Sequence, residues 1–322
     1  MGRAKALRTA VFTVLCAVLL CATSPTARPK QPARTAAQNA RAPQSAPKPN
    51  AAPSGYVGSE VCSACHQDLY NNLQKTPHWK TTLDTKRGAA FQGCEACHGP
   101  GAEHVASGGD PTKIFRFDNA TAKEITAKCL TCHQYGEEHS NFDRSQHNTN
   151  DVTCTDCHSP HHAKQAQFLL VDSQPQLCYS CHLDIKPEFS KPFHHRVNEQ
   201  LIQCSDCHNQ HGGFVTKQLR STAAQDVVCF NCHADKAGPF VFEHQVVKVD
   251  GCLACHVPHG SSNPHMLTRS QVNTLCLECH TLTIDSSVPG APSFHNQATV
   301  YQACTLCHTQ IHGSNFDPNF FK

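Results

Sequence analysis

The sequence predicts a fold of short α-helices and long loops, with almost no β-structure, built from repeated units. The pentapeptide Cys-x-x-Cys-His occurs ten times between Cys62 and His308, and from Cys129 onward successive copies start 23 to 28 residues apart. Gly, Pro, Asn and His interrupt nearly every apolar run, as in HNQHGG (208–213) and HVPHGSSNP (256–264). We expect short helices around the motifs, with residues 121–129 and 225–232 suited to a helix that delivers the first thiol.

The pentapeptide is typical of covalent haem attachment. Its two thiols bond to one edge of a porphyrin and its imidazole binds the iron. Disulfides or zinc sites would also use paired cysteines, but neither explains a histidine at the fifth position in all ten copies. We therefore predict a multihaem cytochrome c with ten covalent haem c groups and no other use of these thiols. The expected attachment cysteines are Cys62, Cys65, Cys94, Cys97, Cys129, Cys132, Cys154, Cys157, Cys178, Cys181, Cys204, Cys207, Cys229, Cys232, Cys252, Cys255, Cys276, Cys279, Cys304 and Cys307, and the expected proximal ligands are His66, His98, His133, His158, His182, His208, His233, His256, His280 and His308.

The motifs alternate between two kinds. Plain motifs, which have no histidine just after them, begin at Cys62, Cys129, Cys178, Cys229 and Cys276; flanked motifs, which have a histidine on each side, begin at Cys94, Cys154, Cys204, Cys252 and Cys304. A plain motif and a flanked motif together make a unit of about 50 residues, a period typical of repeat architectures. Five such two-haem units fill residues 56–322 and predict an elongated, quasi-linear body in which porphyrins form much of the core.

The flanking histidines are candidates for the distal face of each haem. The chain has 24 histidines, of which ten are proximal, and the repeat nominates His78, His104, His147, His161, His195, His211, His244, His259, His295 and His312 as distal ligands. His139, His162, His194 and His265 are left over, and His162 and His194 are alternatives to the nominated residues beside them. Only Met1 and Met266 could supply a methionine ligand, so we expect nearly all haems to be bis-histidine and low in potential. A histidine three residues after a proximal one is expected to bind a neighbouring haem.

The N-terminal region differs in composition from the rest. Residues 1–23 combine basic residues with an apolar run and predict a secretory signal peptide, and residues 24–55 predict a disordered Pro/Ala-rich tether. Cys21 is a candidate lipidation site, although removal with the signal is favoured because Leu20 precedes it. Residues 1–50 hold eight Lys/Arg and no acidic residue, which leaves 19 basic and 25 acidic residues after them. The resulting net charge of −6 disfavours nucleic acid as a ligand.

Several stretches resemble the periplasmic decahaem cytochromes of the MtrA, DmsE and PioA type. They are CEACHGPGAEH (94–104), CSDCHNQHG (204–212), CFNCHADKAGPFVFEH (229–244), CLACHVPHGSSNPHML (252–267) and CTLCHTQIHGSN (304–315), and the resemblance covers roughly residues 56–322. It supports the same ten distal histidines. It also implies a periplasmic protein at the outer membrane that sits inside a β-barrel porin. There it would pass electrons between periplasmic or inner-membrane donors and an extracellular multihaem cytochrome, metal or reductase.

The motifs and the resemblance together favour an electron carrier over an enzyme. A reductase needs an open iron position, whereas distal candidates here outnumber the haems. The alternatives are a soluble periplasmic shuttle or electron-donor subunit for a terminal reductase, a multihaem reductase and a haem filament between chains. The direction of electron flow does not follow from the sequence.

Overall fold

The structure is a computed structural model, and it describes residues 55–136, 138–220, 226–280 and 302–321. These residues belong to a unit that spans residues 51–322. The predicted signal peptide, residues 1–23, and the predicted tether, residues 24–55, lie outside the described residues apart from Gly55. Within the described ranges, no helix combines the length and the apolar character needed to cross a membrane.

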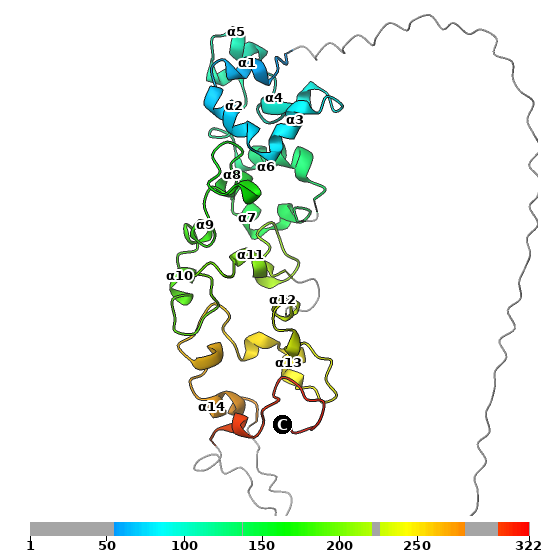
Figure 1. The fold of residues 1–322 in the computed structure, drawn as a ribbon, viewed down its shortest axis with the longest axis vertical. Helices are drawn as coiled ribbons and strands as arrows, with labels where there is room; N and C mark the ends of the chain where they lie inside the picture. The colour runs from blue at the N-terminus through cyan, green and yellow to red at the C-terminus, as the bar shows by residue number, and fades with distance from the viewer. Residues whose placement is uncertain (1–54, 137, 221–225, 281–301, 322) are drawn as a thin grey trace, which may run out of the picture. The chain divides into compact units, whose positions relative to one another are not determined.

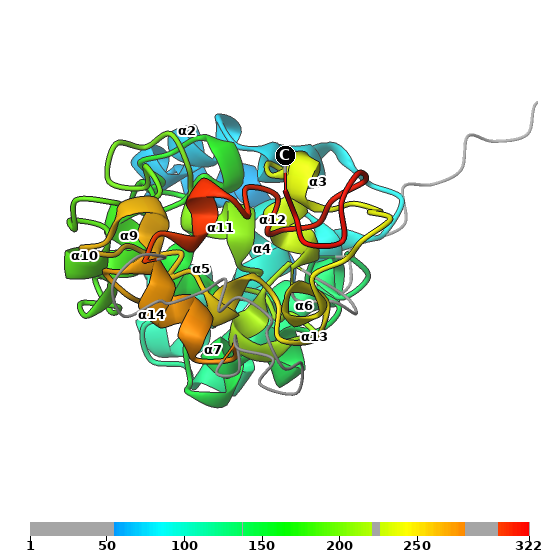
Figure 2. The same cartoon turned by 90° about the horizontal axis from the view of Figure 1, so that it is seen from below.

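Short helices joined by loops make up the described chain (Figures 1 and 2). The longest helix, α6, has 12 residues, and most of the others have one or two turns. In order, the α-helices of the described residues are α1 (Ser59–Ser63), α2 (Gln67–Gln74), α3 (Lys80–Leu83), α4 (Gly93–His98), α5 (Ala102–Ala106), α6 (Ala122–His133), α7 (Gln146–Thr149), α8 (Cys154–Cys157), α9 (Gln176–Tyr179), α10 (Ile185–Glu188), α11 (Cys204–Cys207), α12 (Val227–Phe230), α13 (Gln245–Val249) and α14 (Val272–Leu277).

Single turns of 3-10 helix lie between these helices. They are Pro77–Trp79, Ala89–Phe91, Pro111–Lys113, Phe142–Arg144, Gln167–Leu169, Thr216–Gln218, Ala234–Lys236, Cys252–Ala254, Pro264–Met266 and Cys304–Leu306. In the described part of the chain, β-structure is limited to isolated bridges such as Phe193 with Ser261 and Phe242 with Ser314. The prediction of short helices with almost no sheet is therefore confirmed.

Local sequence explains where the helices begin. Thr121 caps α6 through a reciprocal capping box, in which the Thr121 hydroxyl accepts from the Glu124 amide and the Glu124 carboxylate accepts from the Thr121 amide. This helix carries Cys129 and Cys132, as expected for residues 121–129. The second expected helix is shorter than predicted, because α12 covers only Val227–Phe230 within the range 225–232.

The apolar core of the described polypeptide is small. Its buried hydrophobic side chains are Leu73, Ile125, Phe142, Leu169, Tyr179, Phe189, Val197 and Val228. Tyr179, Phe189 and Val197 form one cluster. A chain of this length normally buries a much larger apolar core, so the polypeptide alone supplies only part of the apolar packing that a fold of this size requires.

Polar contacts tie the N-terminal helices together. Helices α1 and α2 are neighbours, and α4 packs beside both α1 and α3 (Figure 1). The buried Glu95 carboxylate of α4 accepts hydrogen bonds from the backbone amides of Val57, Gly58 and Gly101 at 2.8–3.0 Å. These three bonds satisfy a buried charged group, which would otherwise be costly, and hold the first two motifs against each other.

Candidate haem sites

Each Cys-x-x-Cys-His motif folds into a single helical turn. The amide of the motif histidine donates to the carbonyl of the first cysteine, for example His66 to Cys62 at 2.9 Å and His208 to Cys204 at 3.0 Å. Side chains three and four residues apart lie on one face of a turn. The local fold therefore brings both thiols and the imidazole to the same side of the backbone, as a porphyrin edge and its iron require.

Neighbouring motifs meet at their first cysteines. The first thiol of each plain motif lies beside the first thiol of the next flanked motif, in the pairs Cys62–Cys94, Cys129–Cys154, Cys178–Cys204 and Cys229–Cys252. A hydrogen bond within each pair raises the pKa of one thiol and lowers the pKa of the other. The raised members are Cys62, Cys129, Cys178 and Cys252. The pKa of Cys94 falls to about 6. Burial, and then Cys304, raises the pKa of Cys276 to about 11.

The second cysteines of the flanked motifs lie near the following unit. Burial is the main cause that raises the pKa of Cys97, Cys157, Cys207 and Cys255, and a cysteine of the next plain motif adds to it in each case. Those neighbours are Cys132, Cys181, Cys229 with Cys232, and Cys279. First and second cysteines thus alternate as the neighbours of the next motif, in the order in which the motifs occur along the chain.

Histidine rings face each other in nine pairs, each of which joins a proximal histidine to a histidine nominated as distal. Their ring centres are 6.0–6.3 Å apart, in the pairs His66–His104, His98–His161, His133–His78, His158–His211, His182–His147, His208–His259, His233–His195, His256–His312 and His280–His244. The tenth nominated residue, His295, lies outside the described residues.

The spacing of these pairs fits one metal ion between two imidazoles. A metal–nitrogen bond is about 2 Å long, and a ring centre lies roughly 1 Å beyond its nitrogen, so two imidazoles on one iron have their centres about 6 Å apart. Direct ring stacking would bring the centres closer, as in the contact of His139 with His211 at 4.5 Å. The nine pairs therefore have the separation that bis-histidine haem ligation requires.

The pairs connect different units. The histidine after a flanked motif faces the proximal histidine of the preceding flanked motif, as His211 faces His158 and His259 faces His208. The histidine before a flanked motif instead faces the next plain motif, as His147 faces His182. The first unit differs, because His104 faces His66, and no flanked motif precedes it.

Backbone carbonyls fix the tautomer of the proximal histidines in the flanked motifs. Their Nδ1–H groups donate to Phe115 O, Phe168 O, Lys217 O, His265 O and Asn319 O at 2.5–2.9 Å, from His98, His158, His208, His256 and His308 respectively. A carbonyl can only accept, so Nδ1 carries the proton and Nε2 keeps its lone pair for a metal. This arrangement is common for metal-binding histidines.

Three of these carbonyls belong to residues in the left-handed region. Phe168, Lys217 and His265 have φ values of 59°, 58° and 57°, and the residue after each also has a positive φ. Such a conformation costs a non-glycine residue roughly 1–2 kcal/mol. The same strained turn recurs after the fourth, sixth and eighth motifs and in each case directs a carbonyl at the proximal imidazole.

Four of the five nominated distal histidines that face plain motifs are anchored in a similar way. The Nδ1–H groups of His104, His147, His195 and His244 donate to Asp110 O, Gln210 O, Pro258 O and Ile311 O at 2.6–2.9 Å. The last three acceptors each precede a distal histidine of the next unit, namely His211, His259 and His312. One backbone segment therefore carries both a nominated distal histidine and the carbonyl that orients another.

A glycine follows each of these three distal histidines, and the close contacts of the chain explain it. A Cβ on Gly260 would lie 2.2 Å from Glu188 O, and one on Gly313 would lie 2.1 Å from the Phe240 ring. Beside them, the backbones of Phe193 and Ser261 exchange two hydrogen bonds at 3.1 and 2.8 Å. We call this contact between successive units the His-Gly clasp; it recurs between Phe242 and Ser314.

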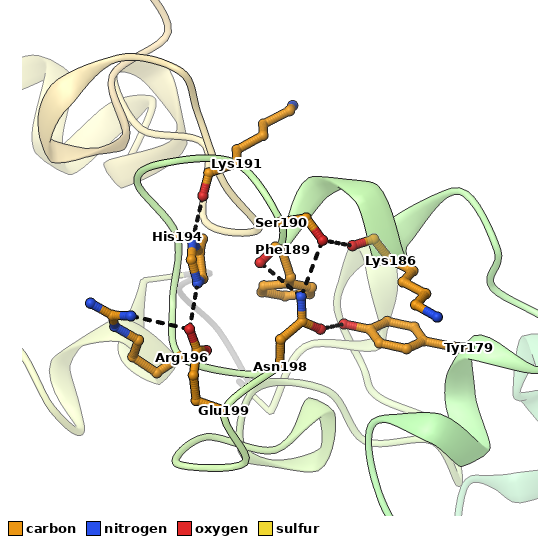
Figure 3. Close-up of polar contacts among 9 residues, drawn as sticks. All are labelled: Tyr179, Lys186, Phe189, Ser190, Lys191, His194, Arg196, Asn198 and Glu199. Atoms are coloured by element: carbon orange, nitrogen blue, oxygen red, sulfur yellow. Dashed lines mark hydrogen bonds and ion pairs between the residues drawn. The ribbon is translucent and has the colours of Figure 1, made fainter.

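The leftover histidines have other surroundings. His194 donates from Nδ1 to Lys191 O at 2.5 Å, and its Nε2 lies 3.0 Å from the Glu199 carboxylate, so both nitrogens are engaged (Figure 3). His195, not His194, faces a proximal ring. His162 contacts His161, while His139 lies against both His133 and His211. His265 contributes its carbonyl, a role that no residue-type pattern could have indicated.

One group of side chains resembles a different metal site. The ligand atoms of Asp226, Cys229 and Cys252 lie within 4.8 Å of one another. However, both cysteines belong to haem motifs, and the Asp226 carboxylate already accepts from the Cys252 amide at 2.9 Å. The carboxylate therefore serves to join two motifs, as the Ser59 hydroxyl does at Cys94.

Comparisons with known proteins agree with this geometry. The chain is 32% identical over 268 residues to the multihaem cytochrome MtrA of Shewanella baltica (strain OS185), an alignment that covers 80% of this chain and 79% of that protein. The chain belongs to the MtrA family of multihaem cytochromes. It carries covalently bound haem c and transfers electrons, and the recognition of this family from the sequence is confirmed.

Weaker similarities extend to larger cytochromes of Geobacter sulfurreducens. The polyhaem cytochrome OmcC is 26% identical over 79% of this chain, and OmcB of strain DL-1 / KN400 is 24% identical over 66%. The alignments cover only 26% and 27% of those proteins. This chain therefore matches only about a quarter of the length of each of those proteins.

Two family descriptions match segments of the chain. Residues 104–159 match the family of cytochrome c554 and c-prime, and residues 147–187, 194–238 and 244–283 match a doubled CXXCH motif. The three doubled segments begin at or next to an upstream histidine and end just past a plain motif. Each one therefore encloses a pair of facing rings, His147 with His182, His195 with His233 and His244 with His280.

Proposed function

We propose that this chain is a periplasmic decahaem wire that carries electrons across the outer membrane inside a β-barrel porin. It would link periplasmic or inner-membrane donors to an extracellular multihaem cytochrome, metal or reductase. The observation that carries this proposal is the order in which the motif cysteines neighbour one another: the first cysteines of a plain and the next flanked motif lie side by side, and each described second cysteine of a flanked motif feels the charge of a cysteine in the next plain motif. Because these thiols mark the porphyrin edges, haems attached there would lie edge to edge along the whole series.

Axial ligation is part of the same proposal. The nine facing pairs supply both ligands of nine haems, and His295 is left to complete the haem of His308. The predicted distal ligands are thus His78, His104, His147, His161, His195, His211, His244, His259, His295 and His312. Each haem iron supplies one-electron redox chemistry, and a full set of ligands leaves no coordination site for a substrate, which favours a carrier over a reductase.

Ligation can be tested with single substitutions. In His295→Ala, we expect one of ten haems to change from low-spin to high-spin in the electron paramagnetic resonance spectrum, because its iron loses an imidazole. His162→Ala is the matched control and should leave the wild-type spectrum. Retention of ten low-spin haems in the His295→Ala protein would show that His295 is not a ligand.

The membrane role can be tested by purification and by electron transfer. We expect detergent extracts of outer membranes to yield this chain together with a β-barrel protein, and liposomes that contain the pair to pass electrons to an enclosed dye. Purification of the chain alone, with a full complement of haem, would contradict the porin complex. The net charge of −6 after residue 50 also suits salt-dependent docking to a soluble partner, so strong salt dependence together with such a result would favour the periplasmic shuttle.

A further inference from the structure

The axial histidines show one exception to an otherwise regular hydrogen-bonding scheme. Among the nine described ring pairs, eight have at least one Nδ1–H group that donates to a backbone carbonyl. In flanked motifs this group belongs to the proximal ring, and in plain motifs it belongs to the distal ring. The ninth pair, His133 with His78, has no such bond among the described residues, and His78 Nδ1 is buried without a hydrogen-bond partner.

The neighbouring sequence explains the exception. His147, His195 and His244 each donate to the residue before a distal histidine that is followed by glycine. By the same register His78 would donate to Pro160, the residue before His161. However, His162 occupies the place of that glycine. The close approach that a glycine permits is lost there, and the His-Gly clasp does not form between these described segments.

Local contacts hold His78 in place instead. It lies in the turn Pro77–Trp79, where its carbonyl accepts from the Thr81 hydroxyl at 2.7 Å and its neighbour Trp79 packs edge-on against Tyr70. On the other ligand, the ring of His139 lies 5.6 Å from that of His133, but no hydrogen bond joins these two described side chains. Among the described residues, neither imidazole of the pair therefore donates from Nδ1 to a protein carbonyl, and His78 Nδ1 is also shielded from water.

This difference changes the electron donation to the iron. A hydrogen bond from Nδ1–H to a carbonyl makes the imidazole a stronger base and a better donor, and a better donor stabilises the more positive, ferric state. Burial without that bond has the opposite effect, because an apolar environment disfavours the extra charge of the ferric site. Both effects raise the reduction potential where the bond is absent.

We propose that the haem held by Cys129, Cys132, His133 and His78 has a higher reduction potential than the eight other haems whose axial rings are described. An electron that enters the protein would then come to rest first at this third motif. This inference rests on the proposed axial ligands.

The test is a potentiometric titration of the complete haem-loaded protein, followed by optical and electron paramagnetic resonance spectra. His78→Met replaces one donor with a methionine, which raises the potential of the haem that it binds, so the component that moves identifies the third haem. His147→Met is the matched control, because its haem has a hydrogen-bonded distal ligand. In the wild-type titration, we expect the haem identified by His78→Met to have a higher reduction potential than the haem identified by His147→Met. The difference should be at least tenfold in the reduction equilibrium constant, which is about 59 mV for one electron.

The outcomes separate this inference from the ligand assignment. If the component displaced by His78→Met lies at or below that of the control, the inference is wrong while the ligands stand. If His78→Met leaves every haem with its original spectrum and potential, His78 is not a ligand and the assignment itself fails. Should the methionine variant not load ten haems, His78→Ala titrated with and without free imidazole identifies the same component, as the one that imidazole restores to low spin.

Discussion

The His-Gly clasp predicts a large effect from a very small substitution, Gly260→Ala. The added methyl group would lie 2.2 Å from Glu188 O and 3.1 Å from the Cβ of His194. Since a backbone carbonyl cannot rotate away as the end of a long side chain can, the two segments must separate. The substitution therefore acts on the contact between units and not on a ligand itself.

The size of the effect follows from the bonds that separation would break. Phe193 and Ser261 exchange two backbone hydrogen bonds, and His195 donates to Pro258 O at 2.6 Å. Each bond contributes about 0.5–1.5 kcal/mol net, which gives a loss of roughly 1.5–4.5 kcal/mol in the free energy of unfolding. The ring pairs His208–His259 and His195–His233 should also open, because both depend on this segment.

Denaturant unfolding followed by haem absorbance measures the stability, and electron paramagnetic resonance measures the ligation. Gly108→Ala is the matched control, since Gly108 has a positive φ of 75° and nothing within 4 Å of its added Cβ. It should cost about 1–2 kcal/mol from backbone strain alone and keep every haem low-spin. The reasoning is refuted if Gly260→Ala loses no more stability than Gly108→Ala and retains the wild-type low-spin spectrum.

Three further predictions concern single side chains. His195→Ala should give one high-spin haem in the electron paramagnetic resonance spectrum. His194→Ala should give none, because both His194 nitrogens already bond to Lys191 O and Glu199. A high-spin signal from His194→Ala would reverse the assignment. Lys217→Gly should raise the free energy of unfolding by about 1 kcal/mol, since glycine adopts its φ of 58° without strain; unchanged or lower stability would show that the turn is not strained. The hydrogen bond and charge of Arg220 lower the pKa of Glu138. The stability that this pair contributes is therefore present at neutral pH, and it is lost as the pH falls from the usual pKa of glutamate, about 4.3, through the lowered pKa. Arg220→Gln should weaken this acid dependence, as measured by unfolding at a series of pH values.

Much of the site could be predicted because the residues that attach haem occur in short local sequence patterns. The Cys-x-x-Cys-His motif fixes a turn by itself, and the recurrence of flanking histidines nominates the second ligands. The structure brings nine of the ten nominated residues opposite a proximal ring. The expectation that His211 faces another haem's histidine agrees with its place beside His158.

The partner of each distal histidine could not be predicted, because partners are separated along the chain and meet only through packing. His147 precedes the flanked motif of His158, yet it faces His182 in the next plain motif. The ring that faces His158 is instead His211, which follows the next flanked motif. The carbonyl of His265 was also missed, since a backbone acceptor leaves no trace in residue type. The phase of the repeat is the remaining difference, because the histidine before a flanked motif faces the plain motif of the next unit and not the plain motif of its own unit.

The way in which histidine rings of successive units pair would allow related chains to differ in their number of units. Each internal unit takes one facing histidine from the unit before it and one from the unit after it, and provides one to each. If these histidines are the axial ligands, deletion or duplication of one whole unit would change the haem number by two and leave every iron with two ligands. Only the two ends need special residues, as terminal repeats of solenoid proteins do. At the first end His104 faces His66 and would be its partner on the iron; at the other end, the proposed role of His295 at His308 is the equivalent exception. A chain that lost part of a unit would instead leave an iron without its second ligand, so natural variation in haem number should occur in steps of two.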